Sequence, residues 1–113
     1  MLKRLIILFL FYLFTSLSQA EEFKLTKIVS FKNPPWGSTF INNDEMLITE
    51  KEGRIFLINL IIKEIIEIKH NLNILVSAQG GLLDIIYKNN TIWVSYSENR
   101  ANNKASTSIA KGN

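Results

Sequence analysis

Short runs rich in isoleucine, valine, phenylalanine and threonine alternate with clusters of glycine, asparagine and aspartate over residues 21–113. This pattern predicts short β-strands joined by tight turns, because β-branched and aromatic residues favour strands, whereas Gly, Asn and Asp tolerate the backbone of turns. The expected strands are residues 24–31 (KLTKIVSF), 37–41, 46–50, 54–58, 82–87, 91–97 and 106–110. The strands between residues 37 and 58 are separated by only three or four residues, so they are expected to form an antiparallel meander.

Residues 59–70 (NLIIKEIIEIKH) admit two interpretations. In a helix, Ile61, Ile62, Ile65 and Ile66 would form one apolar stripe. The excess of β-branched residues and the strand-like neighbours favour the second interpretation, a strand at residues 63–69 that is entered through a turn at residues 59–62.

An internal echo indicates a repeat. Residues 40–43 (FINN) and 46–49 (MLIT) resemble residues 87–90 (YKNN) and 92–95 (IWVS), at an offset of about 45 residues. This is the length of one four-stranded blade of a β-propeller. The expected fold is therefore all-β, a partial β-propeller of about one and a half to two four-stranded antiparallel blades. Because a blade cannot bury both of its faces without neighbours, the domain is expected to be truncated.

The first 20 residues are expected to be a helical signal peptide that precedes the domain at residues 21–113. Lys3 and Arg4 form a basic head, residues 5–14 (LIILFLFYLF) are an unbroken apolar run, and residues 18–20 (SQA) supply the small residues of a cleavage site. The alternative is a membrane anchor. A spanning helix needs about 20 apolar residues, roughly twice this run, and the chain has no cysteine to carry a lipid.

Removing the signal peptide changes the charge of the chain. The formal net charge of +3 includes Lys3 and Arg4, so without these two charges the mature chain is near +1. The high isoelectric point therefore gives no reason to expect nucleic-acid binding, and no basic cluster elsewhere gives one. The absence of cysteine excludes disulfides, thiolate catalysis and zinc–thiolate sites.

Few residues form patterns that are typical of catalysis. His70 is the only histidine and is most typical of a surface or turn residue, and no two carboxylates stand out as an acid–base couple, so no catalytic residue is predicted. The most informative segment is residues 79–84 (QGGLLD), where two glycines before an apolar strand permit a sharp bend or a close approach. The carboxamide of Gln79 can donate and accept hydrogen bonds, which suits a polyol substrate. The alternative is a turn residue that satisfies backbone groups.

Four segments carry a family resemblance: residues 35–40 (PWGSTF), 47–55 (LITEKEGRI), 79–84 (QGGLLD) and 94–97 (VSYS). In this order and approximate spacing they resemble the start of the glucose/sorbosone dehydrogenase family, over nearly all of the mature chain. The resemblance implies a six-bladed β-propeller that binds pyrroloquinoline quinone (PQQ) and calcium and acts in the periplasm or outside the cell. The chain departs from the family at residues 60–62 (LII), where relatives place a polar turn.

The resemblance also implies an activity, the oxidation of an aldose sugar at its anomeric carbon, with hydride passing to PQQ and electrons leaving to an external acceptor. In the family, the glutamine of this motif lies in the substrate pocket, and that role carries over to Gln79. The family's histidine base, cofactor-binding residues and calcium ligands lie in later blades and have no counterpart here, so the fragment alone is expected to be inactive. The expected partners are the sugar and the electron acceptor, with no nucleic acid, and with the membrane only during export.

Two other functions stay open at this point. One is a non-catalytic secreted β-propeller that binds glycans or a protein partner, because fold does not fix function. The other is a short exported protein that associates through unpaired strand edges.

Overall fold

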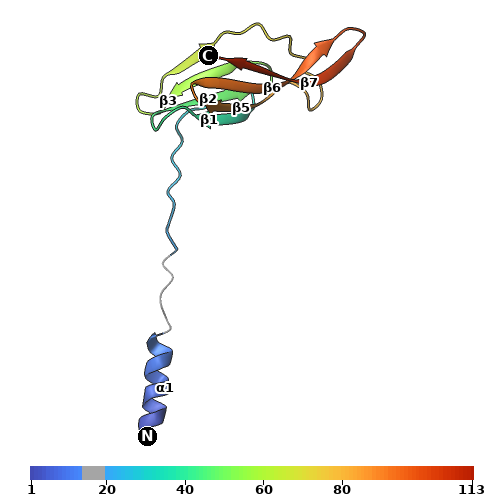
Figure 1. The fold of residues 1–113 in the computed structure, drawn as a ribbon. Helices are drawn as coiled ribbons and strands as arrows, with labels where there is room; N and C mark the ends of the chain where they lie inside the picture. The colour runs from blue at the N-terminus through green and yellow to red at the C-terminus, as the bar shows by residue number, and fades with distance from the viewer. Residues whose placement is uncertain (14–19) are drawn as a thin grey trace.

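The structure, a computed structural model, describes residues 1–13 and 20–113. Over these residues, helix α1 (Leu2–Leu13) is followed by a segment without regular secondary structure and then by two antiparallel sheets (Figure 1). Helix α1 contacts none of the strands and exposes apolar side chains such as Leu5 and Phe9. Within the described ranges, no helix has the length and apolar character needed to cross a membrane. Most of the predicted cleavage site, at residues 18 and 19, lies outside the described residues.

The first sheet is a four-stranded meander with the order β1-β2-β3-β4. Its strands are β1 (Pro35–Phe40), β2 (Glu45–Glu50), β3 (Ile55–Asn59) and β4 (Ile65–Ile68). The β1–β2 turn forms as the sequence predicts, since the side-chain oxygen of Asn42 accepts a hydrogen bond from the backbone N–H of Asp44 at 2.8 Å. The β2–β3 turn contains Gly53 with a φ of 107°, a conformation that favours glycine.

The strand interpretation of residues 59–70 is confirmed by β4. The preceding bend exposes the side chains of Ile61 and Ile62, and the side-chain oxygen of Asn59 accepts hydrogen bonds from both of their backbone N–H groups. The pairing of β3 with β4 runs without a register shift from Ile55↔Ile68 to Ile58↔Ile65. The apolar residues at this bend are therefore exposed, and the ladder that follows is regular.

The second sheet has the order β5-β6-β7. Its strands are β5 (Leu82–Lys88), β6 (Thr91–Arg100) and β7 (Lys104–Gly112). Asn89 and Asn90 form the tight β5–β6 turn with φ values of 51° and 57°, which asparagine tolerates better than most residues. Strands β6 and β7 are longer than the sequence predicts, because their ladder continues to the pair Arg100↔Lys104.

The prediction of a strand at residues 24–31 is wrong. The structure has no strand there, and the segment lies between α1 and the sheets (Figure 1). Only its end packs on the domain: the ring of Phe31 lies 5.6 Å from the ring of Phe56 on β3. The apolar composition that suggested a strand is present, but no sheet edge pairs with the segment, and a strand requires a hydrogen-bonded neighbour.

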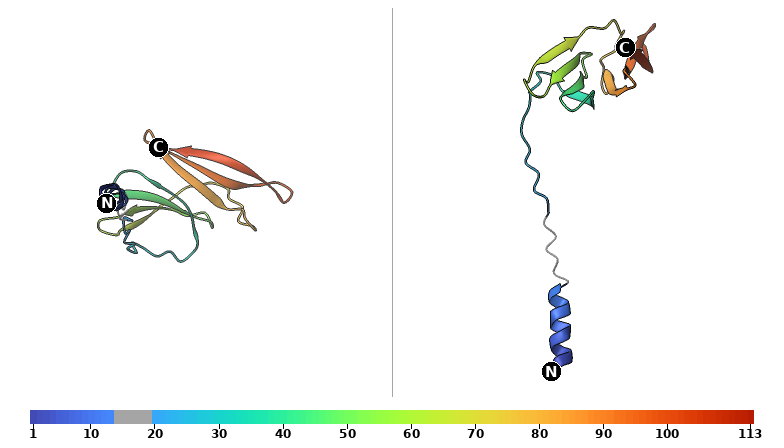
Figure 2. Two further views of the ribbon diagram at one scale, coloured as in Figure 1. Left: turned by 90° about the horizontal axis from the view of Figure 1, so that it is seen from below. Right: turned by 60° about the vertical axis from the view of Figure 1, so that its left-hand side comes forward.

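The two sheets lie side by side as repeated units (Figure 2). Both inner strands carry a register irregularity at equivalent places, between Pro35 and Ser38 in β1 and between Leu82 and Ile85 in β5. Strands β1 and β5 run in the same direction without pairing, since residue 37 meets residue 84 and residue 39 meets residue 87. This is the arrangement of neighbouring blades, so the fold is all-β and forms part of a β-propeller, as the sequence predicts.

The core lies between the two sheets. Its buried members are Leu47 and Ile55 from the first sheet and Leu82, Ile85, Val94 and Tyr96 from the second. The opposite face of the second sheet is open, and it exposes Ile86, Trp93 and Ile109 by 55%, 43% and 73%. The repeat makes Trp93 equivalent to Leu47, so this open face corresponds to the face of the first sheet that packs on the second sheet.

Candidate functional site

The predicted substrate residue Gln79 lies at the tip of a tight turn formed by residues 77–80. Ser77 and Gly80 exchange backbone hydrogen bonds of 3.3 Å and 2.7 Å across this turn. Ala78 adopts a φ of 49°, in the left-handed region. The side chain of Gln79 is exposed, so its amide and carbonyl groups face solvent. The structure thus leaves the carboxamide exposed, and its role toward a sugar stays a prediction.

The two glycines after Gln79 permit the close approach that the sequence predicts. A Cβ atom on Gly81 would lie 2.2 Å from the backbone oxygen of Lys51, and one on Gly80 would lie 2.8 Å from the Oγ atom of Ser97. The backbone then connects both sheets: Leu82 N–H donates to the Lys51 carbonyl at 2.9 Å, and Ser97 N–H donates to the Gly81 carbonyl at 2.8 Å. Any side chain at position 81 would break this junction.

The β2–β3 turn, which contains Lys51, also contacts the Gln79 turn through the Lys51 side chain. The ammonium group of Lys51 donates a hydrogen bond to the Ala78 carbonyl, immediately before Gln79. Lys51 follows Glu50, which is 1% exposed and pairs with Arg54 across the β2–β3 turn, with Nη2 to Oε2 at 2.6 Å. No motif or pattern in the sequence points to Lys51 as a functional residue. Its position beside a glycine-rich turn depends on the packing of two sheets, which local pattern does not reveal.

Thr49 joins the two inner strands and was also missed. Its side chain is fully buried, and its Oγ1 atom accepts a hydrogen bond from Gly37 N–H at 2.9 Å and donates one to the Leu83 carbonyl at 2.7 Å. At Gly37 the strands are so close that a Cβ atom would lie 2.9 Å from the Cα atom of Asp84. A threonine in an alternating strand gives no sequence signal for such a bridge, because its partners come from two separate strands.

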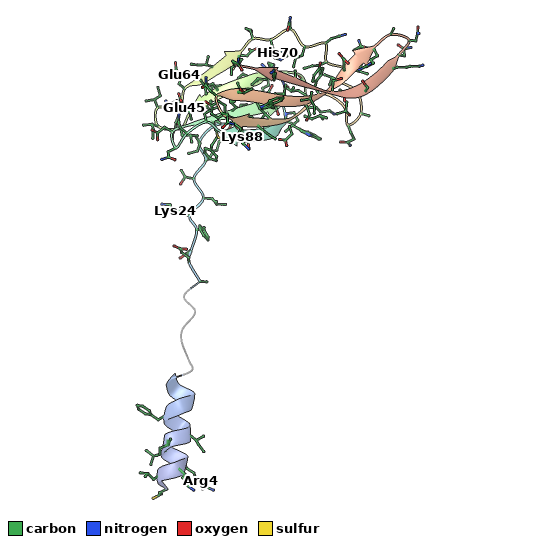
Figure 3. All side chains as sticks on the ribbon, in the orientation of Figure 1. Arg4, Lys24, Glu45, Glu64, His70 and Lys88 are labelled. Carbon is green, nitrogen blue, oxygen red and sulfur yellow. The ribbon has the colours of Figure 1, made fainter. Side chains whose placement is uncertain are left out.

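His70 has a structural role in the region described. Its Nδ1 atom accepts a hydrogen bond from Leu72 N–H at 3.2 Å, which assigns the ring proton to Nε2 and makes this nitrogen the donor to the Gly53 carbonyl at 2.5 Å. The imidazole thereby fixes the β2–β3 turn to the chain that leaves β4. Figure 3 shows His70 on the sheets and Lys24 on the segment that leads to them. His70 is exposed and lies just after β4, as expected for a surface or turn residue.

The carboxylates are dispersed and are used locally. Glu50 is neutralised by Arg54, and Glu67 on β4 accepts a hydrogen bond from Lys69 at 2.9 Å, which lowers the pKa of Glu67. Asp84 accepts a hydrogen bond from the backbone N–H of Ile85 at 2.8 Å. Among residues 1–13 and 20–113, no three His, Cys, Asp or Glu side chains gather in a group that could hold a metal ion. Carboxylates of the described residues therefore do not form a cluster of the kind that binds calcium.

The sequence model of the glucose/sorbosone dehydrogenase family matches residues 32–113, which include both sheets, Lys51 and Gln79. The chain belongs to this family. Solved structures agree with the assignment. Two structures of glucose dehydrogenases are each 26% identical to the chain, with TM-scores of 0.64 and 0.65 over 71% of it.

The crystal structure of the soluble aldose sugar dehydrogenase from Escherichia coli, in its apo-form, is 29% identical, with a TM-score of 0.64 over 71% of the chain. The chain spans about a quarter of the length of these solved structures, since it covers 25% to 27% of them. A search of curated proteins found no match. In this member of the glucose/sorbosone dehydrogenase family, the residues that the family model matches, 32–113, contain both sheets and do not include α1.

Proposed function

We propose that the chain is the amino-terminal part of an exported, PQQ-dependent aldose dehydrogenase of the glucose/sorbosone dehydrogenase family. The observation that carries this proposal is the family match over residues 32–113, together with two repeated sheets that hold the residue 79–84 motif at their junction. The substrate would be an aldose sugar that is oxidised at its anomeric carbon. Electrons would pass from the reduced quinone to an external acceptor.

Among the described residues, Gln79 would contribute to function by binding the sugar. Its exposed carboxamide offers one acceptor oxygen and two donor hydrogens, a set that can bind two neighbouring hydroxyl groups of a sugar. PQQ would be the hydride acceptor, and a calcium ion would be bound together with it. Both are proposed from the family alone, and neither is assigned to a residue of this chain. The family's histidine base is likewise proposed to lie beyond residue 113, so the 113-residue chain alone should not oxidise sugars.

Export to the periplasm or the cell exterior is the second part of the proposal. Its support is α1, a 12-residue helix that carries the basic residues Lys3 and Arg4 near its start, is apolar after them, and contacts none of the strands. Residues 1–20 would be removed by signal peptidase, so sequencing the exported protein from its amino terminus should begin at Glu21. A retained Met1 would contradict cleavage.

The experiment that tests the activity uses the full product of the gene, loaded with PQQ and calcium, in a dye-reduction assay with glucose. Gln79→Ala should raise the KM for the sugar about tenfold, because one or two hydrogen bonds to the substrate are lost. Asn71→Ala removes another exposed amide and serves as the matched control, with no change expected. Absence of dye reduction by the loaded wild type would overturn the proposal. Sugar binding without dye reduction would favour the non-catalytic propeller.

A further inference from the structure

Lys51 forms hydrogen bonds with both ends of the segment 78–82, which contains Gln79. The Lys51 ammonium group donates to the Ala78 carbonyl, one residue before Gln79, and the Lys51 carbonyl accepts from Leu82 N–H at 2.9 Å, three residues after it. The absence of a side chain at Gly81 lets that carbonyl reach the segment. One residue of the first blade therefore brackets the exposed turn that leads into the second.

Lys51 is itself held firmly by the β2–β3 turn. Its backbone N–H donates to the Pro34 carbonyl at 3.3 Å, and the turn closes with a bond of 2.9 Å from Gly53 N–H to the Glu50 carbonyl. The buried carboxylate of Glu50 is paired with Arg54 through both the Nε and Nη2 atoms, at 2.8 Å and 2.6 Å. A charge-assisted pair of this kind keeps the two ends of the turn in fixed positions. The lysine thus extends from a rigid base.

The Gln79 turn has little other support. Within the described residues, the hydrogen bonds of residues 77–80 are those between Ser77 and Gly80 and the bond from Lys51. Residues 77, 78 and 79 are exposed, so water competes with the internal bonds of the turn. The Lys51 ammonium group, which is anchored in the β2–β3 turn, is therefore the main external restraint on the orientation of the Gln79 turn.

We infer that Lys51 is a positioning residue for Gln79, which orients the carboxamide through the Ala78 carbonyl and does not itself contact the substrate. This inference rests on the proposed function of Gln79. Ground-state sugar binding depends on the direction of the carboxamide, whereas the hydride transfer is proposed to occur on groups elsewhere. Loss of the lysine donor should therefore raise KM more than it lowers kcat.

The test compares Lys51→Met, Lys51→Arg and the control Lys88→Met in the full gene product. Lys88 is an exposed lysine at the end of β5, and its side chain forms no hydrogen bond within the described residues. Lys51→Met should raise the KM for glucose about three- to tenfold, the effect of one lost hydrogen bond, with kcat within about twofold. Lys51→Arg retains a donor and should recover most of the affinity.

Amide hydrogen exchange provides a readout that does not depend on turnover. In Lys51→Met, the amides of Gly80 and Leu82 should exchange faster, because the segment loses its external restraint, while those of β6 keep their protection. Unchanged exchange at both amides, or an arginine variant as impaired as the methionine variant, would overturn the inference.

The two proposals fail in different ways. If Gln79→Ala raises KM and Lys51→Met does not, the positioning role is wrong and the proposed function stands. If the wild type reduces no dye, the proposed function is wrong, and the exchange rates still decide whether Lys51 restrains the turn. If Lys51→Met does not fold, Lys51→Gln takes its place, because the glutamine side chain is shorter and uncharged and does not reproduce the lysine donor. Wild-type KM and wild-type exchange rates in Lys51→Gln would then overturn the inference.

Discussion

The Thr49 hydroxyl offers a direct test of how the two blades are joined. It is the buried group that binds β1 and β5 at once, with an accepted bond of 2.9 Å from Gly37 N–H and a donated bond of 2.7 Å to the Leu83 carbonyl. Thr49→Val keeps the volume of the side chain and removes both bonds. Thr49→Ser keeps both bonds and removes one methyl group.

The structure gives the expected size of each effect. In Thr49→Val, the Gly37 N–H and the Leu83 carbonyl lose their buried partner, and each group left unpaired costs about 1–3 kcal/mol. The added methyl group recovers about 0.8 kcal/mol, so the net loss in the free energy of unfolding is about 1–5 kcal/mol. In Thr49→Ser, only one buried methyl group is lost, which costs about 1 kcal/mol.

Urea unfolding followed by tryptophan fluorescence measures these losses, because Trp36 and Trp93 lie on different sheets. With a slope of about 2 kcal/mol per molar urea, the midpoint should fall by about 0.5–2.5 M for Thr49→Val and by about 0.5 M for Thr49→Ser. Ser95 accepts a bond from Asp84 N–H at 3.2 Å at the equivalent, partly exposed place in the second sheet, so Ser95→Ala should cost at most about 0.5 kcal/mol. A serine variant less stable than the valine variant would refute the bridging role.

Three further outcomes follow from the structure. Gly81→Ala places a methyl group 2.2 Å from a backbone oxygen and should lower the melting temperature by several degrees, which calorimetry checks; an unchanged transition would contradict the close approach. In the 113-residue chain, Ile109→Lys should reduce self-association measured by sedimentation, because Ile109 lies on the open apolar face of the second sheet. Ile62 is similarly exposed but lies at the β3–β4 bend, so Ile62→Lys should not change self-association. The bond from Lys69 lowers the pKa of Glu67, so any stability that this pair contributes is present above the unfolded-state pKa and is lost as the pH falls through the lowered value. An NMR titration should show a low midpoint for Glu67 that rises toward its ordinary value in Lys69→Met.

Much of the fold could be predicted from the sequence because the local signals agree with the final structure. The turns at residues 42–44 and 89–90 contain Asn and Asp, which accept the backbone geometry found there. The echo between the two halves predicted the repeat, and the structure strengthens it with the shared register irregularities of β1 and β5. The glycines after Gln79 predicted a close approach, although the sequence did not show that the approaching group is the Lys51 carbonyl.

The sequence by itself determined the strand-forming segments, their turns and the family, because these depend on residue type, alternation and motif order along the chain. The tertiary structure decided which segments find a partner. Residues 24–31 have the composition of a strand and stay unpaired, whereas β6 and β7 extend their ladder to residues 100 and 104. It also decided the roles of Thr49 and Lys51, since their partners lie on the neighbouring blade. Hydrogen bonds between blades depend on the position of one sheet against another, and no pattern within either sheet specifies that position.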